Sequence, residues 1–258
     1  MSIELGKFNT LEVVKTVDFG VYLDGKEEGE ILLPTRYVPE NCVPGDLLNV
    51  FLYLDNEERL IATTLTPLVQ VGEFACLEVA WVNEFGAFLN WGLMKDLFVP
   101  FREQKMKMQV GKSYVVHAHI DEESYRIVAS AKIERYLSKE TPTYQAGAEV
   151  DILIWQKTDL GFKAIIDQQF PGLLYDSEIF QSLRTGMTLK AFVKQVRPDG
   201  KIDLILQKPG AAKVDDFASS LLDYIKEHGG AVKLNDKTPA DDIYQIFGVS
   251  KKTFKKAV

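Results

Sequence analysis

The sequence predicts a multidomain, mainly β protein with three tandem five-stranded barrels followed by a C-terminal helical domain. Two observations predict this architecture. A unit of about 65 residues occurs three times, and each copy holds short β-rich runs separated by Gly, Pro, Asn and Asp turn signals. After the third copy, the apolar residues change to helical spacing.

Each copy of the repeat contains two glycines at a constant spacing of 25 residues. The three pairs are Gly20 and Gly45, Gly86 and Gly111, and Gly161 and Gly186. We expect these glycines at sharp bends or bulges, where a Cβ atom would clash. A unit this short suits a closed five-stranded barrel, which has no exposed strand edges. Polar and proline-containing linkers place the domain boundaries at 1–66, 67–138, 139–209 and 210–258.

The C-terminal segment has the pattern of three short helices. The first follows from apolar residues at helical spacing, namely Val214, Phe217, Leu221, Leu222 and Ile225. Thr238 and Pro239 begin the second helix, which runs through Phe247, and Ser250 caps the third, with Phe254 and Val258 facing inward. The tight turn between the last two helices predicts a helix-turn-helix unit. A three-helix packing unit without nucleic-acid contacts would have the same pattern.

The motif Phe-Gly-x-aromatic, followed 12 residues later by Pro34, Pro100 or Tyr175, resembles the RNA-binding domain first defined in ribosomal protein S-one. That resemblance implies the oligonucleotide/oligosaccharide-binding (OB) barrel. Three such repeats and a helix-turn-helix together resemble the conserved virulence factor B family of bacterial RNA-binding proteins. The family ends in a winged helix whose wing follows the third helix. The sequence stops at Val258, about two turns into that helix, so we expect a missing wing or a shortened chain.

The resemblance also implies an RNA face with two aromatics on the second strand, a His on the third, and an Asp and an Arg four residues apart near the last two strands. By position, the first repeat supplies Phe19, Tyr22, Asp55 and Arg59, with Pro34 in place of the His. The second supplies Phe85, Phe88, Glu122 and Arg126, with Pro100 in place of the His. The third supplies Leu160, Lys163, Tyr175, Arg197 and Lys201.

Charge is distributed unevenly along the chain. The net charge of -7 argues against a uniform nucleic-acid binder. Residues 1–66 hold 5 basic and 12 acidic side chains, whereas the other three predicted domains are close to neutral. The field of the first repeat should repel phosphate. We therefore expect the second and third repeats and the tail to bind RNA, and deletion of residues 1–66 to leave the affinity largely intact.

Single-stranded RNA is held by aromatic rings that stack on bases and by cations that follow the phosphates. The main predicted RNA-binding residues are Phe85, Phe88, Arg126, Lys163, Tyr175, Lys201, Lys251, Lys252, Lys255 and Lys256. Further candidates are Phe19, Tyr22, Arg59, Arg102, Trp155 and Arg197. In the alternative interpretation the rings belong to barrel cores, as we expect for Leu160, and the lysine run is a solvated helix face. We expect Trp81, Trp91 and Trp155 to be structural or partly buried.

Several function classes are excluded. His117 and His119 share one strand face at the spacing of a two-His metal site, but the sequence offers no third ligand, so we expect a surface or partly buried pair. The sequence has no nucleotide-binding loop, nucleophile elbow or metal-ligand cluster, which predicts no enzymatic activity, cofactor, metal or small-molecule substrate. Two cysteines, no secretory signal and no long apolar run predict a cytoplasmic protein without a membrane partner.

The sequence therefore predicts a protein that holds single-stranded RNA across tandem OB barrels and a helical domain. It would regulate RNA turnover or translation, and hence gene expression, by occupancy, with the ribosome or RNA-processing proteins as further partners. The alternative is a protein-interaction adaptor whose acidic first barrel docks on basic partners.

Overall fold

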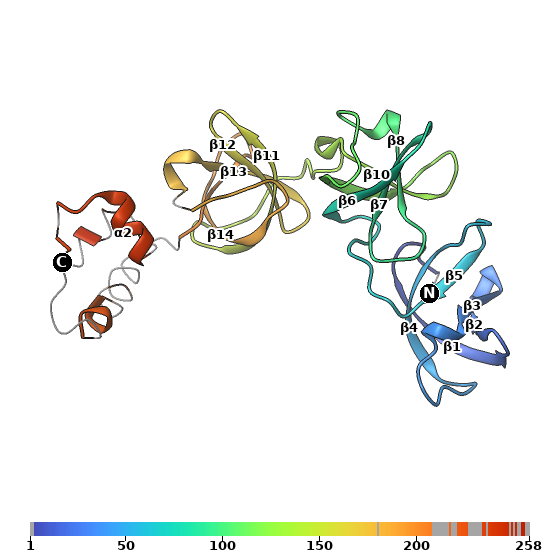
Figure 1. Ribbon diagram of the computed structural model, residues 1–258. Coiled ribbons are helices and arrows are strands. Elements are labelled where there is room, and N and C mark those ends of the chain that lie inside the picture. The colour runs from blue at the N-terminus through green and yellow to red at the C-terminus, as the bar shows by residue number, and fades with distance from the viewer. Residues whose placement is uncertain are drawn as a thin grey trace. The chain divides into compact units, whose positions relative to one another are not determined.

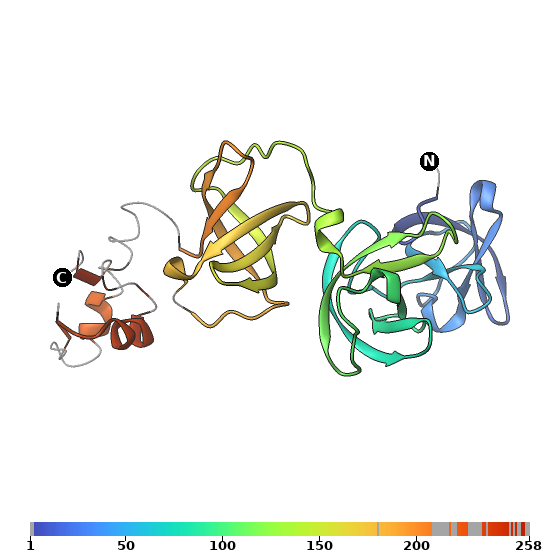
Figure 2. The same cartoon turned by 90° about the horizontal axis from the view of Figure 1, so that it is seen from above.

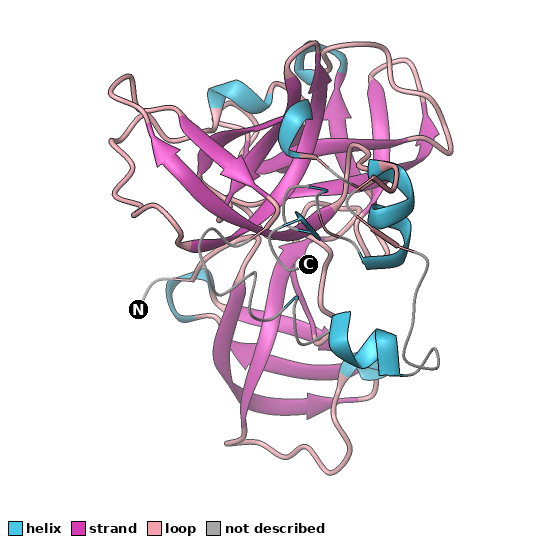
Figure 3. Cartoon of the chain, turned by 90° about the vertical axis from the view of Figure 1, so that its left-hand side faces the viewer, coloured by secondary structure: helices cyan, strands magenta, loops and turns pink. Residues whose placement is uncertain are grey.

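Three closed five-stranded barrels lie in sequence order ahead of a small helical domain in the computed structural model (Figure 1). The structure describes residues 3–179, 181–207, 217, 221–226, 234–235, 237–247, 249, 251 and 254–255. The chain divides into two compact units, Met1–Tyr136 and Leu137–Val258. Strands dominate the barrels and short helical turns join some of them (Figure 3). The predicted fold class is confirmed.

The strands of all three barrels are short. The first barrel consists of β1 (Phe8–Val17), β2 (Gly20–Asp24), β3 (Glu30–Pro34), β4 (Leu47–Leu54) and β5 (Leu60–Thr63). The second consists of β6 (Phe74–Val82), β7 (Gly86–Asn90), β8 (Leu97–Pro100), β9 (Ser113–Ile120) and β10 (Ile127–Ser130). The third consists of β11 (Glu149–Thr158), β12 (Gly161–Ile166), β13 (Phe170–Tyr175), β14 (Thr188–Val196) and β15 (Ile202–Ile205).

The three barrels share one topology, seen from above in Figure 2. The first strand pairs antiparallel with the second and the fourth, and the third strand closes the barrel against the fifth in parallel. The parallel closure has one pair in each of the first two barrels (Leu32 with Ile61, and Phe98 with Val128) and three pairs in the third. Closure leaves no free strand edge that could pair with another chain.

The first glycine of each repeat sits where two strands approach closely. A Cβ atom on Gly20, Gly86 or Gly161 would lie 2.2, 2.2 or 1.9 Å from a backbone carbonyl oxygen of the neighbouring strand. These distances are far below a van der Waals contact, so only glycine fits without displacing the strand. The expected clash is confirmed, although the bulge itself lies on the preceding strand.

The second glycine of each repeat supports that bulge. Gly45, Gly111 and Gly186 all have positive φ. Their backbone amides donate to the carbonyls of Val13, Val79 and Ile154, respectively, at 2.8, 2.9 and 2.8 Å. Directly after each of these acceptors, the strand register shifts by one residue. The constant spacing of 25 residues between the two glycines is therefore explained. In every barrel the turn that contains the second glycine must lie against the bulge in the first strand.

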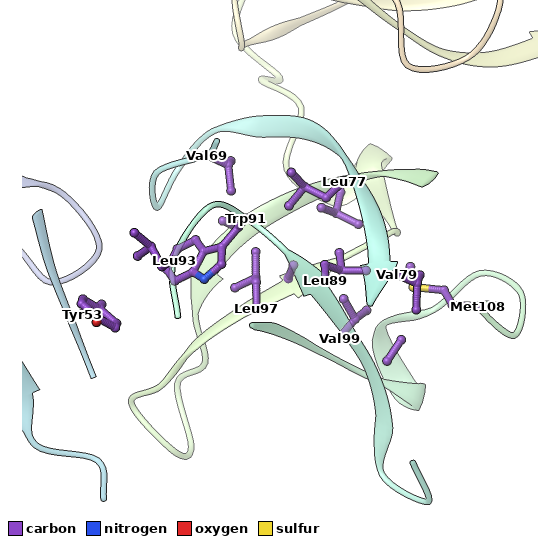
Figure 4. Close-up of a cluster of buried hydrophobic side chains, with 14 of the residues drawn as sticks. Tyr53, Val69, Leu77, Val79, Leu89, Trp91, Leu93, Leu97, Val99 and Met108 are labelled. Carbon is purple, nitrogen blue, oxygen red and sulfur yellow. The ribbon is translucent and has the colours of Figure 1, made fainter. Parts of the chain in front are cut away.

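The hydrophobic core of the second barrel extends into the first barrel, which also has a separate core of its own. Phe51 of β4 is fully buried against Trp91 of the second barrel, with ring centroids 5.7 Å apart, and Tyr53 belongs to the same cluster as Val69 and Leu93. Figure 4 shows Trp91 and Leu93 on the side of the second-barrel core that faces Tyr53. Deleting residues 1–66 would remove Phe51 and Tyr53 from this cluster and expose Trp91, so the expected retention of RNA affinity after this deletion stays a prediction whose test must also check the folding of the second barrel.

The C-terminal domain has a small apolar core of its own. Phe217, Leu221, Ile243 and Phe254 are buried together. Helix α2 (Ala240–Phe247) begins where the amide of Ile243 donates to the carbonyl of Pro239 at 3.2 Å, as Thr238 and Pro239 predict. The predicted inward position of Phe254 is confirmed, whereas Leu222 is exposed. Val214 and Val258 lie outside the described residues. Among the described residues, no helix has both the length and the apolarity to span a membrane.

Replacing Gly20 with alanine should destabilise the first unit far more than replacing Gly29. Both positions have positive φ, but a Cβ on Gly29 meets no atom within 4 Å. We expect Gly20→Ala to cost about 1–3 kcal/mol more than Gly29→Ala, because the neighbouring strand must move. Urea unfolding of the two variants measures the difference. Equal losses would show that the backbone conformation, and not the close approach, requires glycine here.

Candidate nucleic-acid interface

Equivalent backbone positions project side chains onto one face of each barrel. The carbonyls of Phe19, Phe85 and Leu160, each just before the first glycine, accept hydrogen bonds from residues 35, 101 and 176 at 3.0, 3.2 and 3.1 Å. The strand register aligns Tyr22, Phe88 and Lys163 in the same way, opposite Lys15, Trp81 and Gln156. The first glycines likewise pair with Pro34, Pro100 and Tyr175. The three faces can therefore be compared position by position.

The face of the second barrel is an aromatic ladder. The rings of Trp81 and Phe88 stack with centroids 3.7 Å apart and an interplanar angle of 3°, and Phe98 continues the row at 4.8 Å. The indole Nε1 of Trp81 donates to Asp96 at 2.8 Å, which fixes the orientation of the ring. Phe85, at the edge of this ladder, is 65% exposed. A solvent-accessible row of flat rings is the arrangement on which unpaired bases stack.

The ladder lines a cleft of about 1000 Å³ between the first and second barrels. Trp81, Phe85 and Phe88 line it from the second barrel, and Tyr53 and Glu58 line it from the first. Both barrels belong to the same compact unit, Met1–Tyr136. Phe85 and Phe88 thus occupy a shared cleft and are not sealed inside the core of the second barrel.

The cations of the cleft already have acidic or carbonyl partners. Arg126 forms an ion pair with Glu58 of the first barrel, and Arg102 contacts Asp121 at 2.6 Å and Glu123 at 3.2 Å. Hydrogen bonds from Ser124 and the charge of Arg102 hold the pKa of Asp121 below its usual value despite partial burial. Exposed ion pairs of this kind contribute only about 0–1 kcal/mol, so a phosphate can replace the carboxylates at little cost.

Lys95 completes the cationic groups of the cleft, because its Nζ donates to the carbonyl of Asp55 at 2.6 Å. Burial lowers the pKa of Lys95 from its ordinary value. The lysine joins the loop after β4 to the second barrel, which stabilises the wall of the cleft.

The face of the third barrel is cationic and has fewer rings. The Nζ of Lys163 lies 4.9 Å from the centroid of Trp155, which is itself buried at the bulge. Lys163 has no carboxylate partner among the residues that the structure describes. Lys201 contacts Asp199 at 2.8 Å and remains exposed. This face can contact phosphates with less competition from acids than the other two.

A buried acid orients the remaining side chains of the third face. Asp203, which is almost fully buried, accepts hydrogen bonds from Arg197 Nε at 2.9 Å and Gln195 Nε2 at 2.7 Å. Arg197 also donates to the hydroxyl of Tyr175. Tyr175 and Arg197 are therefore positioned as a unit, with the guanidinium 5.7 Å from the ring centroid.

The face of the first barrel combines two rings with paired charges. Phe19 and Tyr22 meet edge-to-face at 6.3 Å, so they share a face. Phe19 lies in the turn before β2 and is not bound by strand alternation, so no bulge at Gly20 is needed. Arg59 pairs with Asp55 at 2.8 Å and Glu57 at 2.9 Å. Burial alone would raise the pKa of Asp55, but hydrogen bonds from Arg59 outweigh it and lower that pKa.

Three expectations from the sequence need correction. Leu160 is 62% exposed and not a core residue, because it occupies the same turn position as Phe19 and Phe85. Trp81 is 44% exposed and a member of the stacking face, which sequence reasoning missed. The acid at the second hairpin is Asp121 and not Glu122. The backbone amide of Asp121 donates to the carbonyl of Arg126, as that of Asp55 does to Arg59, across a loop one residue longer than in the first barrel.

The lysine-rich tail is described only in part. Lys255 is exposed and Lys251 is half-buried on either side of the buried Phe254. Lys252 and Lys256 lie outside the described residues. The described lysines thus accompany a helix whose apolar residue packs into the domain core.

His117 and His119 are a packed pair. The ring of His117, which is 7% exposed, stacks on Tyr136 at 4.1 Å, and the Tyr136 hydroxyl lies 3.1 Å from Nε2 of His119. Burial lowers the pKa of His117 to about 4 and also lowers that of His119. The part of the chain that the structure describes holds no cluster of three metal-ligating side chains. The pair thus packs the last residue of the first unit against β9.

Comparisons with known proteins match this architecture. Residues 5–65 match the S1 domain family, and residues 219–258 match the CvfB-like winged helix domain. The chain is 29% identical over 268 residues to the protein YitL of Bacillus subtilis, covering 100% of this chain and 88% of that protein. It is 20% identical over 266 residues to conserved virulence factor B of Staphylococcus haemolyticus, covering 98% and 88%. The chain is thus similar over nearly its full length to a protein named conserved virulence factor B, and it carries matches to an S1 domain and to a CvfB-like winged helix domain.

A solved structure with similar domains is a multidomain protein with nucleic acid binding domains from Streptococcus pneumoniae. It is 24% identical, covers 98% of this chain and 91% of its own, and superposes with a TM-score of 0.45. OB barrels and helix-turn-helix domains are both nucleic-acid-binding modules. The matches to an S1 domain and to a winged helix domain therefore indicate nucleic-acid binding.

The buried histidines should make the first unit sensitive to acid. The pKa of His117 is lower in the folded than in the unfolded chain, so the unfolded chain binds more protons between these values. The stability is complete above about pH 6.5 and decreases as the pH falls towards about 4. We expect a loss on the order of 2 kcal/mol at about pH 4.5. Urea unfolding at several pH values measures it, and His117→Gln should have a flatter profile. An equal slope in the variant would contradict this assignment.

Proposed function

We propose that the protein binds single-stranded RNA and regulates RNA turnover or translation in the cytoplasm by occupancy, without catalysing a reaction. The observation that carries the proposal is the ladder of Trp81, Phe88 and Phe98 in a cleft, with Phe85 exposed beside it. Bases of a single strand are free to stack on such rings, whereas those of a duplex already stack on one another. The cleft therefore favours single strands.

The second and third faces have complementary roles in this proposal. The second barrel offers rings, with its cations held in weak ion pairs, and the third offers Lys163, Lys201 and Arg197. Stacking contributes affinity for bases of any sequence, and the cations contribute affinity for the backbone. Linked modules raise one another's effective concentration, so modest affinities combine into strong binding of one strand.

Removing rings from the ladder should weaken binding of a single strand. A stacked base contributes about 1–3 kcal/mol, so Trp81→Ala and Phe85→Ala should each raise the Kd for a fluorescent oligouridine by about 5- to 150-fold. Phe19→Ala, at the position equivalent to Phe85, should change it less than about twofold. Fluorescence anisotropy with the full chain measures all three. Equal affinity for a duplex RNA, or no effect of either ladder variant, would contradict the proposal.

Neutralising Lys163 should reduce the salt dependence of RNA binding. Each phosphate contact on a single strand changes the slope of log Kd against log salt by about 0.7. Lys163→Gln should therefore lower the slope by about that amount. Lys190→Gln removes the same charge from a lysine that contacts Asp151 at 2.8 Å, and it should leave the slope unchanged. If Lys163→Gln and Lys190→Gln gave the same slope of log Kd against log salt, Lys163 would not contact a phosphate.

A further inference from the structure

We propose that the aromatic face of the first barrel binds a basic segment of another protein. This goes beyond the proposed RNA binding, because it gives the first barrel a different kind of partner on the equivalent face. The surface consists of the rings of Phe19 and Tyr22, of Asp18, which precedes Phe19 in the chain, and of Asp55 and Glu57, which pair with the Arg59 that interacts with Tyr22; we call it the acidic aromatic face.

The rings of this face are open to solvent. Phe19 is 57% exposed, close to the value for Phe85 in the second barrel, and Tyr22 is half-buried beside it. In the second barrel Trp81 lies opposite Phe88 and covers its ring. In the first barrel Lys15 occupies the position of Trp81, opposite Tyr22. The first barrel thus offers an exposed edge-to-face pair of rings without the stacked ladder.

A cation already lies on one of these rings. The Nζ of Lys15 lies 4.6 Å from the centroid of Tyr22 and forms an ion pair with Glu30. This is the combination of ring and carboxylate that binds an ammonium or guanidinium group. Phe19, the more exposed ring, directly follows the exposed Asp18 in the chain and has no cation over it among the described contacts. An external Arg or Lys side chain can reproduce at Phe19 the contact that Lys15 makes at Tyr22.

The charges of the face repel phosphate and attract cations. Arg59, which interacts electrostatically with Tyr22, is compensated by both Asp55 and Glu57, and Glu57 remains highly exposed. Asp18 is exposed next to Phe19 and has no ion-pair partner among the residues that the structure describes. Residues 1–66 as a whole hold 5 basic and 12 acidic side chains. A basic segment is therefore the occupant that this surface complements.

Arginine-rich segments fit the surface best. A guanidinium can lie flat over the Phe19 ring while its N–H groups donate to a carboxylate such as Asp18, which a compact ammonium does less well. The recognised partner is thus an exposed, arginine-containing stretch of a basic protein.

The test measures binding of a fluorescent nine-arginine peptide to the full chain by anisotropy. Phe19→Ala should raise the Kd for the peptide at least fivefold and leave the oligouridine affinity unchanged. The double variant Asp18→Asn/Glu57→Gln should have a similar effect on the peptide. Phe19 and these acids are exposed, and thermal unfolding checks that the variants remain folded.

The control removes the same charge from the same barrel. Glu27→Gln/Glu28→Gln alters the turn Lys26–Glu28, at the opposite end of the β2–β3 hairpin from Phe19, and should change the peptide affinity less than twofold. Equal losses for the two double variants would overturn the proposal in favour of non-specific charge attraction. Loss of oligouridine binding in Phe19→Ala, with the peptide unaffected, would show that this face binds RNA. Absence of oligouridine binding by the unmodified chain would contradict the proposed function alone.

Discussion

The close approach of each first glycine to a neighbouring carbonyl fixes the backbone on which all three faces depend. Gly20, Gly86 and Gly161 bring the second strand of each barrel close to the third. A carbonyl at the bulge of the first strand accepts a hydrogen bond from the amide of the second glycine. With this frame held constant, the turn residue and the strand residue after it always reach the same face. Differences between the barrels then reside in side chains alone.

Those side chains divide the chemistry among the modules. The second barrel concentrates rings, the third holds Arg197 on the buried Asp203 and adds Lys163 and Lys201, and the first combines its rings with an excess of acids. A face with many carboxylates loses phosphate affinity whatever rings it holds, because the charge acts over a longer range than stacking. One fold thus presents three different surfaces, and each must be assessed by its own residues.

The sequence was sufficient for the barrels but not for every member of the faces. Glycine spacing and strand-like runs predict the repeat because they reflect local backbone requirements. The sequence did not predict Trp81 as a member of the stacking face. A one-residue bulge in β6 shifts its side chain onto that face, and a bulge leaves no clear sequence signal. Asp121 was missed because the loop between Asp121 and Arg126 is one residue longer than the equivalent loop between Asp55 and Arg59 in the first barrel. In the sequence, Phe51 and Trp91 have the pattern of ordinary core residues. Their contact between two barrels depends on how the barrels pack, which the sequence pattern does not indicate.

The extension of the second-barrel core into the first barrel has a consequence for synthesis on the ribosome. Phe51 emerges well before Trp91, and until that second segment has left the exit tunnel the Phe51 ring has its contact with Phe8 but lacks its contact with Trp91. Domains commonly fold one after another as the chain lengthens. The N-terminal barrel has a closed sheet and a core of its own, so it can form first, and the contact of Phe51 with Trp91 adds stability once the second barrel has been synthesised.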